Sequence, residues 1–177
     1  LRIGTLIMIT ALAGMAISGG PSLSLAQVLV LALSVLAASS AAGAFNQYVE
    51  ADSDRLMART RNRAFATGTL QPGARWLLLI VALLAAAVAS AASVLNAASA
   101  TFIFLGAFFY GVVYTVWLKR RSWTNIVVGG LSGSFAVLAG AAAVDPGLGA
   151  LPLLLALVLF LWTPPHFWSL AIASRDD

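Results

Sequence analysis

The strongest constraint on this chain is the length of its uncharged segments. No Asp, Glu, Lys or Arg occurs in residues 3–49, 76–118, 122–144 or 146–174. A helix that crosses a bilayer needs about 20 apolar residues, so each segment can hold at least one span. The apolar residues are continuous and do not alternate with polar ones, which favours helices over a β-barrel. We therefore predict an all-α, polytopic transmembrane helix bundle.

The composition excludes several other classes of protein. Of the 177 residues, 61% are hydrophobic and 9% are charged, whereas soluble domains carry about 25% charged residues. The absence of cysteine rules out disulfides and thiolate metal sites. We attribute the net charge of +4 to membrane topology and expect no nucleic-acid partner.

Turn-forming residues at 19–22, 96–99 and 145–147 divide the long apolar segments. They predict six helices, at residues 3–18, 25–48, 75–95, 99–118, 123–144 and 149–174. The first is short for a span, and two Asp residues stand directly after the last. We therefore expect residues 1–177 to form a single transmembrane domain that is truncated at both ends.

The basic residues fit one topology. In a six-span arrangement all of them lie on the same side of the membrane: Arg2, Arg55, Arg59, Arg61, Arg63, Arg75, Lys119, Arg120, Arg121 and Arg175. Five of the six acidic residues lie there too, Asp145 being the exception. Because basic loops stay inside, this side is predicted to be cytoplasmic, in the inner membrane of a bacterial cell.

An acidic stripe ends the second predicted helix. Asn46, Glu50 and Asp54 are spaced at i, i+4 and i+8, which places them on one helical face, while Asp52 points away from Glu50. Oxygen ligands on one face suit Mg²⁺, which usually takes one or two carboxylates and completes its shell with water and phosphate oxygens. The alternative is a solvated helix end in the headgroup region.

Basic and aromatic residues near this stripe are candidates for binding an anion. They are Arg59, Arg63, Tyr114, Lys119 and Arg120. Guanidinium and ammonium groups suit a diphosphate. The competing interpretation is ordinary membrane architecture, in which an aromatic belt and basic anchors stand at the cytoplasmic ends of spans.

The last predicted helix contains an unusual polar site. His166, the one histidine of the chain, follows Pro164 and Pro165, which interrupt backbone hydrogen bonding inside a span. Such a histidine is often a hydrogen-bonded structural residue; it could also ligate haem iron or transfer protons. Asp176 and Asp177 would bring a second acidic group to the same side of the membrane.

Several of these patterns together resemble the intramembrane (UbiA) prenyltransferase superfamily. Its first motif, N-x-x-x-D-x-x-x-D, is matched by Asn46, Glu50 and Asp54, with Glu50 in place of the usual Asp. The protohaem IX farnesyltransferase branch continues with D-x-D-x-x-M-x-R-T-x-x-R, matched within residues 52–63. Further similarity to that branch lies at Tyr114-Thr115, Lys119-Arg120, Asn125-Ile126-Val127, Gly129-Gly130 and Trp162 to Trp168, although residues 132–140 lack a frequent Pro-Pro.

The resemblance implies a nine-helix bundle around a lipid-open cavity, with about six spans present here. It implies Mg²⁺-dependent transfer of a farnesyl group from farnesyl diphosphate to a vinyl group of haem B, giving haem O. Catalysis would depend on Asn46, Glu50, Asp54 and Lys119. Further partners could include haem A synthase or oxidase assembly proteins.

The resemblance also assigns metal-binding and substrate-binding roles to individual residues. Asn46, Glu50 and Asp54 would hold one Mg²⁺, and Asp176 or Asp177 another. The farnesyl diphosphate and haem would contact Arg59, Arg63, Tyr114, Lys119, Arg120 and His166. Two alternatives remain at this stage: a prenyltransferase acting on a quinone precursor or chlorophyll-type acceptor, and a non-enzymatic membrane protein such as a transporter.

Overall fold

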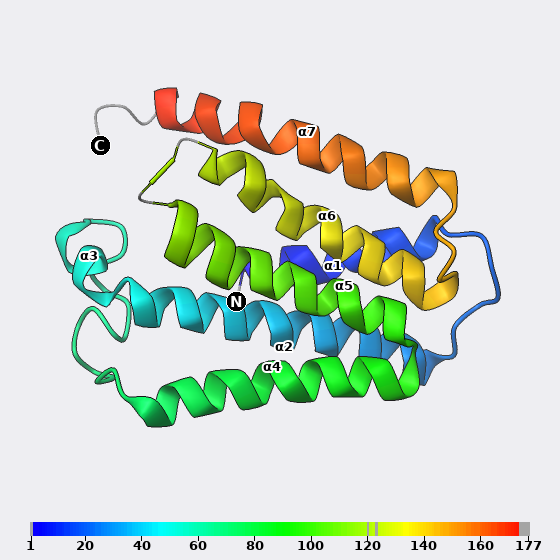
Figure 1. The fold of residues 1–177 in the computed structure, drawn as a ribbon, viewed down its shortest axis with the longest axis horizontal. Helices are drawn as coiled ribbons and strands as arrows, with labels where there is room; N and C mark the ends of the chain where they lie inside the picture. Colours follow the sequence, from blue (N-terminus) through cyan, green and yellow to red (C-terminus); the bar gives the residue numbers. More distant parts are fainter. Residues whose placement is uncertain (1, 120, 123, 174–177) are drawn as a thin grey trace.

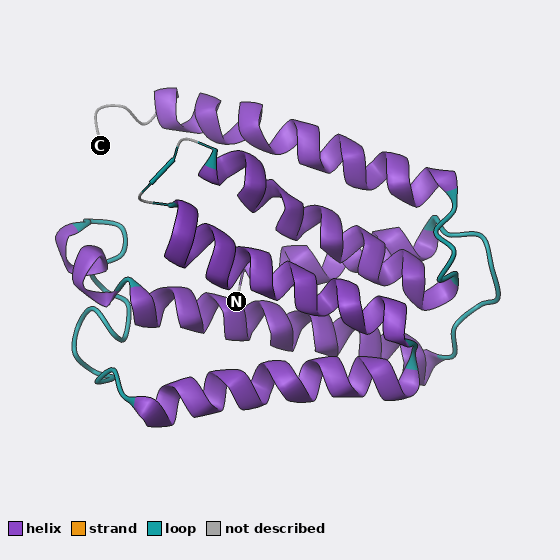
Figure 2. Cartoon of the chain, viewed as in Figure 1, coloured by secondary structure: helices purple, strands orange, loops and turns teal. Residues whose placement is uncertain are grey.

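The helices of this protein run side by side along the long axis of the molecule (Figure 1). The computed structural model describes residues 2–119, 121–122 and 124–173, and within these residues every regular element is a helix (Figure 2). In chain order they are α1 (Arg2–Ala16), α2 (Leu25–Val49), α3 (Ala51–Leu56), α4 (Ala74–Val94), α5 (Ala97–Phe108), the π-helix η1 (Phe109–Leu118), α6 (Asn125–Val144) and α7 (Ala150–Ala173). The predicted all-α class is confirmed.

Five helical segments are long and apolar enough to cross a membrane: α2, α4, α5 together with η1, α6 and α7. The first predicted span is a helix of 15 residues, shorter than the other five. The remaining predicted boundaries lie within about two residues of those observed. The chain is therefore an integral membrane protein built from a helix bundle.

Side-chain caps explain two of the predicted turns between helices. Ser24 and Gln27 form a capping box at the start of α2. Asn96 caps α5: its Oδ1 accepts from the Ser99 backbone N–H at 2.8 Å, and its Nδ2 donates to the Ala142 carbonyl at 2.7 Å. The second bond ties the turn between α4 and α5 to α6.

Small residues allow α6 to pack at the centre of the bundle, against α1, α5 and α7. A Cβ at Gly140 would overlap the carbonyl oxygen of Ala11, and one at Gly14 would overlap that of Val137. Such close approach is typical of helix packing in lipid. Large apolar side chains of α4 and α7 instead face outward, as a lipid-facing surface requires.

Two features differ from the predicted helices. The acidic stripe is interrupted at Glu50, where α2 has ended and α3 has not begun, although the backbone bonds from Glu50 to Asn46 and from Asp54 to Glu50 persist. The span predicted at 99–118 is α-helical to Phe108 and π-helical from Phe109. Periodicity in the sequence does not indicate where a helix changes its hydrogen-bond register.

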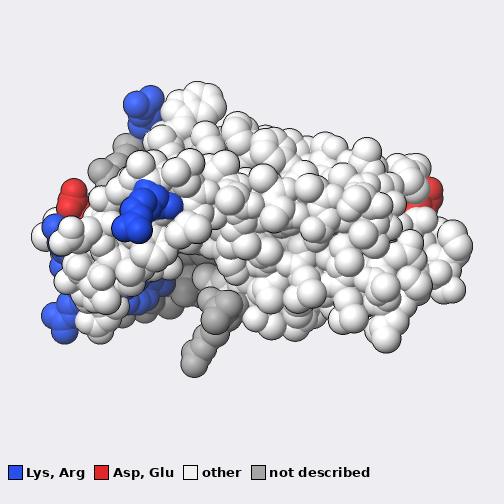
Figure 3. All heavy atoms as spheres, turned by 90° about the horizontal axis from the view of Figure 1, so that it is seen from below, with Lys and Arg blue, Asp and Glu red and all other residues white. Residues whose placement is uncertain are grey.

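On the face seen in Figure 3 the Lys and Arg side chains lie at one end of the molecule, and the white surface between the two ends shows no charged side chain. The end that holds α3 also holds the end of η1 and the start of α4 (Figure 1). Asp145 lies in the loop between α6 and α7, at the opposite end. Among the charged residues whose side chains the structure describes, all but Asp145 lie at the end that holds α3, as predicted. The helix α1, which starts at Arg2, begins part-way along the bundle (Figure 1).

Candidate functional site

An ion pair with a buried carboxylate joins Glu50, between α2 and α3, to Lys119 at the end of η1. The Nζ of Lys119 lies 2.6 Å from Oε1 and 2.7 Å from Oε2 of Glu50, whose residue is 5% exposed. Asn46 Nδ2 donates to Glu50 Oε2 at 2.9 Å and to Thr115 Oγ1 at 3.1 Å. A buried carboxylate needs such partners, because an unpaired charge away from water is costly.

A second buried pair lies one turn further along the chain. Arg63 donates from Nη1 to both oxygens of Asp54, at 3.1 and 2.9 Å, and Asp54 is 3% exposed. The loop that carries Arg63 is fixed by Phe65, which packs edge-on against Tyr48 and Trp76 with centroids 5.6 and 5.9 Å apart. The fold therefore holds one cation on each buried carboxylate.

The π-helix places aromatic rings beside these pairs. Tyr110 and Tyr114 stack with centroids 5.6 Å apart, and Lys119 Nζ lies 6.0 Å from the Tyr114 ring centroid. Tyr114 packs on Gly129 of α6, where a Cβ would lie 2.9 Å from Tyr114 Cδ2. This close contact fixes Tyr114 near the cluster.

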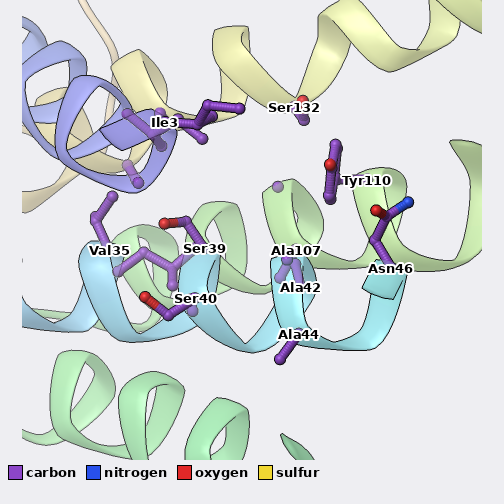
Figure 4. A pocket seen from close by; sticks show the side chains of 18 of the residues that line it. Ile3, Val35, Ser39, Ser40, Ala42, Ala44, Asn46, Ala107, Tyr110 and Ser132 are labelled. Atoms are coloured by element: carbon purple, nitrogen blue, oxygen red, sulfur yellow. The ribbon is translucent and has the colours of Figure 1, made fainter. Parts of the chain in front are cut away.

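A cavity of about 530 Å³ lies between α1, α2, α5 and α6, and most of its lining side chains are small or apolar. Asn46 and Tyr110 stand at one end, and Ile3 and Val35 at the other (Figure 4). Along α2 the lining extends from Val35 to Gln47, a length of about 18 Å at about 1.5 Å per residue. Arg63 also lines the cavity, so the cavity adjoins the buried ion pairs.

The acidic stripe carries oxygen atoms of the kind that bind a hard metal ion, and in this structure its two carboxylates pair with Lys119 and Arg63. It offers two carboxylates and an amide oxygen, hard donors of the kind that Mg²⁺ prefers. Among the described residues no group of three or more His, Cys, Asp or Glu side chains could hold a metal ion. Mg²⁺ usually takes one or two carboxylates from a protein and completes its shell with water and phosphate oxygens.

Other predicted site residues lie outside the cluster. Arg59 is exposed, and Asp52, with a side chain 96% exposed, pairs with Arg55 at 3.2 Å. His166 lies on α7, stacked on Trp162 with centroids 4.3 Å apart, and it does not line the cavity. Three predicted residues lie outside the described part of the chain: Arg120, Asp176 and Asp177.

Sequence reasoning gave no role to two residues of the cluster. Thr115 belongs to a motif similar to the family but was given no function, and it contacts Asn46. Tyr110 belongs to none of the predicted motifs, and it lines the cavity. The spacing between Thr115 and Lys119 could have signalled that they share a helix face, since residues four apart are neighbours. Which residues of α2 they meet depends on tertiary packing.

The site can now be compared with known proteins. The profile of the UbiA prenyltransferase family matches residues 7–177. Protoheme IX farnesyltransferases 2 and 1 of Paramagnetospirillum magneticum are 59% and 49% identical to the chain, covering 100% and 99% of it and 62% of each relative. The Protoheme IX farnesyltransferase of Cereibacter sphaeroides (strain ATCC 17025) is 39% identical, over 99% of the chain and 56% of the relative.

A solved structure shows the same fold. The apo structure of a UbiA homologue from Aeropyrum pernix K1 superposes with a TM-score of 0.76 at 24% identity, covering 99% of the chain and 65% of that protein. The chain spans about three fifths of the length of the curated relatives it matches. By the extent of the family match, this chain belongs to the UbiA prenyltransferase family.

Proposed function

We propose that the protein to which this chain belongs transfers a farnesyl group from farnesyl diphosphate to a vinyl group of haem B, giving haem O. The similarity to three proteins named protoheme IX farnesyltransferase supports this choice of substrates. The observation that carries the proposal is a largely apolar cavity adjoining two buried carboxylates, each held on both oxygens by a cation.

Lys119 and Arg63 would bind the diphosphate. Their side chains are 33% and 34% exposed, so each can turn from its carboxylate toward an anion beside the cavity. The buried carboxylate that it leaves would then need a metal ion as its partner. The positive charge of Lys119 and Arg63 would stabilise the leaving diphosphate, on which negative charge builds in the transition state. Arg59, Arg120 and Tyr114 would complete the diphosphate site.

Asn46, Glu50 and Asp54 would hold one Mg²⁺, and Asp176 or Asp177 a second. When bound, Mg²⁺ neutralises charge on the diphosphate and so favours cleavage of the allylic carbon–oxygen bond. Asn46 is the member of the stripe that lines the cavity. Glu50 and Asp54 would be free to bind metal once Lys119 and Arg63 have moved to the diphosphate.

The cavity would hold the farnesyl chain and shield the allylic cation from water. Its apolar lining between α2 and α6 suits a hydrocarbon, and its polar end places the diphosphate beside Asn46 and Arg63. The haem would approach from the side of α7, where His166 would orient it, through its iron or by contact with its ring. The reaction would take place at the cytoplasmic face of a bacterial inner membrane, the side to which basic loops belong.

The test uses the purified full-length protein in detergent or lipid nanodiscs. Given haem B, farnesyl diphosphate and Mg²⁺, it should form haem O, identified by chromatography and mass. An aromatic quinone precursor offered in place of haem B should give no prenylated product. Prenylation of that precursor without any haem O would overturn the proposed acceptor.

A further inference from the structure

The cavity stops at its apolar end against a packed layer of the bundle. On each of the four helices that line it, the residue one turn beyond the last lining residue is buried and does not line the cavity. We call these four residues the cavity floor: Ala11 of α1, Leu31 of α2, Ser99 of α5 and Ala143 of α6. Three are 0% exposed and Ala143 is 7% exposed, so among the described residues the cavity does not continue past this layer.

Direct contacts between helices hold the floor in place. The Ser99 hydroxyl donates to the Ala139 carbonyl oxygen at 2.8 Å, which joins α5 to α6. A Cβ at Gly140 would overlap the Ala11 carbonyl oxygen, so α1 and α6 meet backbone to backbone. Leu31 is the largest of the fully buried side chains and belongs to the same core cluster as Ala11. Since packed interiors leave little free volume, a ligand cannot pass this layer without displacing it.

The opposite end of the cavity fixes where a prenyl diphosphate would begin. Asn46 and Arg63 line that end, and Arg63 is a proposed partner of the diphosphate. Val35 stands at the apolar end (Figure 4), and Leu31 lies one turn further along α2. Asn46 and Val35 are eleven positions apart on α2, which corresponds to about 16–17 Å at about 1.5 Å per residue. That distance is the room available for the hydrocarbon.

The available length lies between the lengths of two prenyl chains. An extended carbon chain advances by about 1.25 Å per carbon–carbon bond of about 1.5 Å. The farnesyl main chain is therefore about 14 Å long, and the geranylgeranyl main chain, with one more isoprene unit, is about 19 Å long. Three isoprene units fit between the polar end and the floor, whereas the end of a fourth would meet Val35 and Leu31.

We propose that Val35 and Leu31 determine the length of the prenyl chain, by closing the cavity where a farnesyl chain ends. The inference rests on the proposed function, which supplies the position of the diphosphate. A hydrophobic pocket distinguishes ligands that differ by one methylene by about 10–200-fold. An isoprene unit that finds no space is therefore rejected by at least about tenfold.

The test measures binding of three unreactive analogues to the full-length protein in detergent, by isothermal titration calorimetry with Mg²⁺ and without haem B. The analogues are the S-thiolodiphosphates of geraniol, farnesol and geranylgeraniol. The unchanged protein should bind the farnesyl analogue best and the geranylgeranyl analogue at least about tenfold more weakly. Val35→Leu, which extends into the cavity, should weaken binding of the farnesyl analogue about tenfold and leave that of the geranyl analogue within about threefold.

Leu31→Ala changes the floor in the opposite direction. It should strengthen binding of the geranylgeranyl analogue about tenfold and leave that of the farnesyl analogue within about threefold. Because the loss of a buried aliphatic side chain also destabilises a protein, Ile80→Ala is the matched control. Ile80 is buried in α4 and does not line the cavity, so its substitution should leave the order of the three affinities unchanged. If Leu31→Ala does not fold, Val35→Leu decides alone.

Three results would overturn the inference. They are equal binding of the farnesyl and geranylgeranyl analogues by the unchanged protein, unchanged affinity ratios in Val35→Leu, and no binding of any analogue. The first two would mean that a long chain leaves the cavity sideways between the helices. Failure of the proposed reaction would appear differently, as normal length-dependent binding, altered as expected by the floor variants, without haem O formation.

Discussion

Two regions of the molecule carry equally distinctive motifs but are built in different ways. At the junction of α2, α3 and η1, the carboxylates of Glu50 and Asp54 are buried and each contacts a cation from elsewhere in the chain. On α7, His166 is half-buried, and its ring contacts are with Trp162 and Phe167 of the same helix. The first region is fixed by tertiary contacts and the second, within the described residues, by local ones.

The difference has a physical cause. Burying a carboxylate forces it to find a cation or a donor, so the geometry of the first region is set by several helices at once. An aromatic ring on a lipid-facing helix carries no such requirement. Substitutions in the first region should therefore affect the reaction more strongly than substitutions on α7, and four experiments test that order.

The largest effect is expected at Glu50. Glu50→Ala removes a proposed metal ligand and the partner of both Lys119 and Asn46, and it should lower kcat/KM for haem O formation by about 1,000-fold. Lys119 is one-third exposed and can be solvated, so the melting temperature should change little. Asp52→Ala is the control, since that side chain is 96% exposed; a loss as large as that of Glu50→Ala would show that burial does not define the site.

The next effect concerns Lys119. Lys119→Gln removes the charge that spans both oxygens of Glu50 and should raise KM for farnesyl diphosphate by about 100-fold, since it removes a charge-assisted bond to the diphosphate. Arg121→Gln, an exposed residue two positions away, should change KM less than about threefold, as surface charges contribute little. Equal effects of the two variants would favour a general basic surface over a specific contact, and would weaken the contrast between the regions.

The sequence predicts the helices of this bundle well, because the length of an apolar run and the turn residues between runs are local properties. Asn96 and Ser99, for example, mark a turn in the sequence and form the cap of α5 in the structure. The acidic stripe was also identified from spacing, and all three of its members are buried. The exposure of Asp52 agrees with its predicted direction.

The partners within the site could not be read from spacing. Lys119 and Glu50 are 69 residues apart, and their contact depends on how η1 is rotated against α2. The π-helical register shifts that rotation, and nothing in the pattern of apolar residues between 109 and 118 requires it. The contact between Thr115 and Asn46 depends on the same packing.

A smaller effect is expected where the first region continues into the cavity. Gly43 lines the cavity one turn before Asn46, and a Cβ there would meet no atom within 4 Å. Gly43→Leu should fold and fill cavity space, lowering kcat/KM for farnesyl diphosphate by about tenfold or more, with a smaller loss for the shorter geranyl diphosphate.

Gly133→Leu is the matched control for this variant. Gly133 is also a helical glycine with no atom within 4 Å of an added Cβ, but it does not line the cavity. Its substitution should leave the preference between the two diphosphates unchanged. If both variants shift that preference equally, or neither does, the cavity is not the site of the prenyl chain.

The smallest effect is expected at His166, where the second region is tested directly. His166→Ala removes a ring whose contacts, within the described residues, are with Trp162 and Phe167 of its own helix. Haem B should therefore still bind, about fivefold more weakly, with a changed absorbance band if iron is ligated. Ser169→Ala, which removes a hydroxyl bonded to the His166 carbonyl at 2.8 Å, should leave both affinity and spectrum unchanged. If His166→Ala reduced haem binding by a factor as large as the effect of Glu50→Ala on kcat/KM, the comparison between the two regions would be reversed. Such a loss would mean that α7 supplies a principal ligand of the haem.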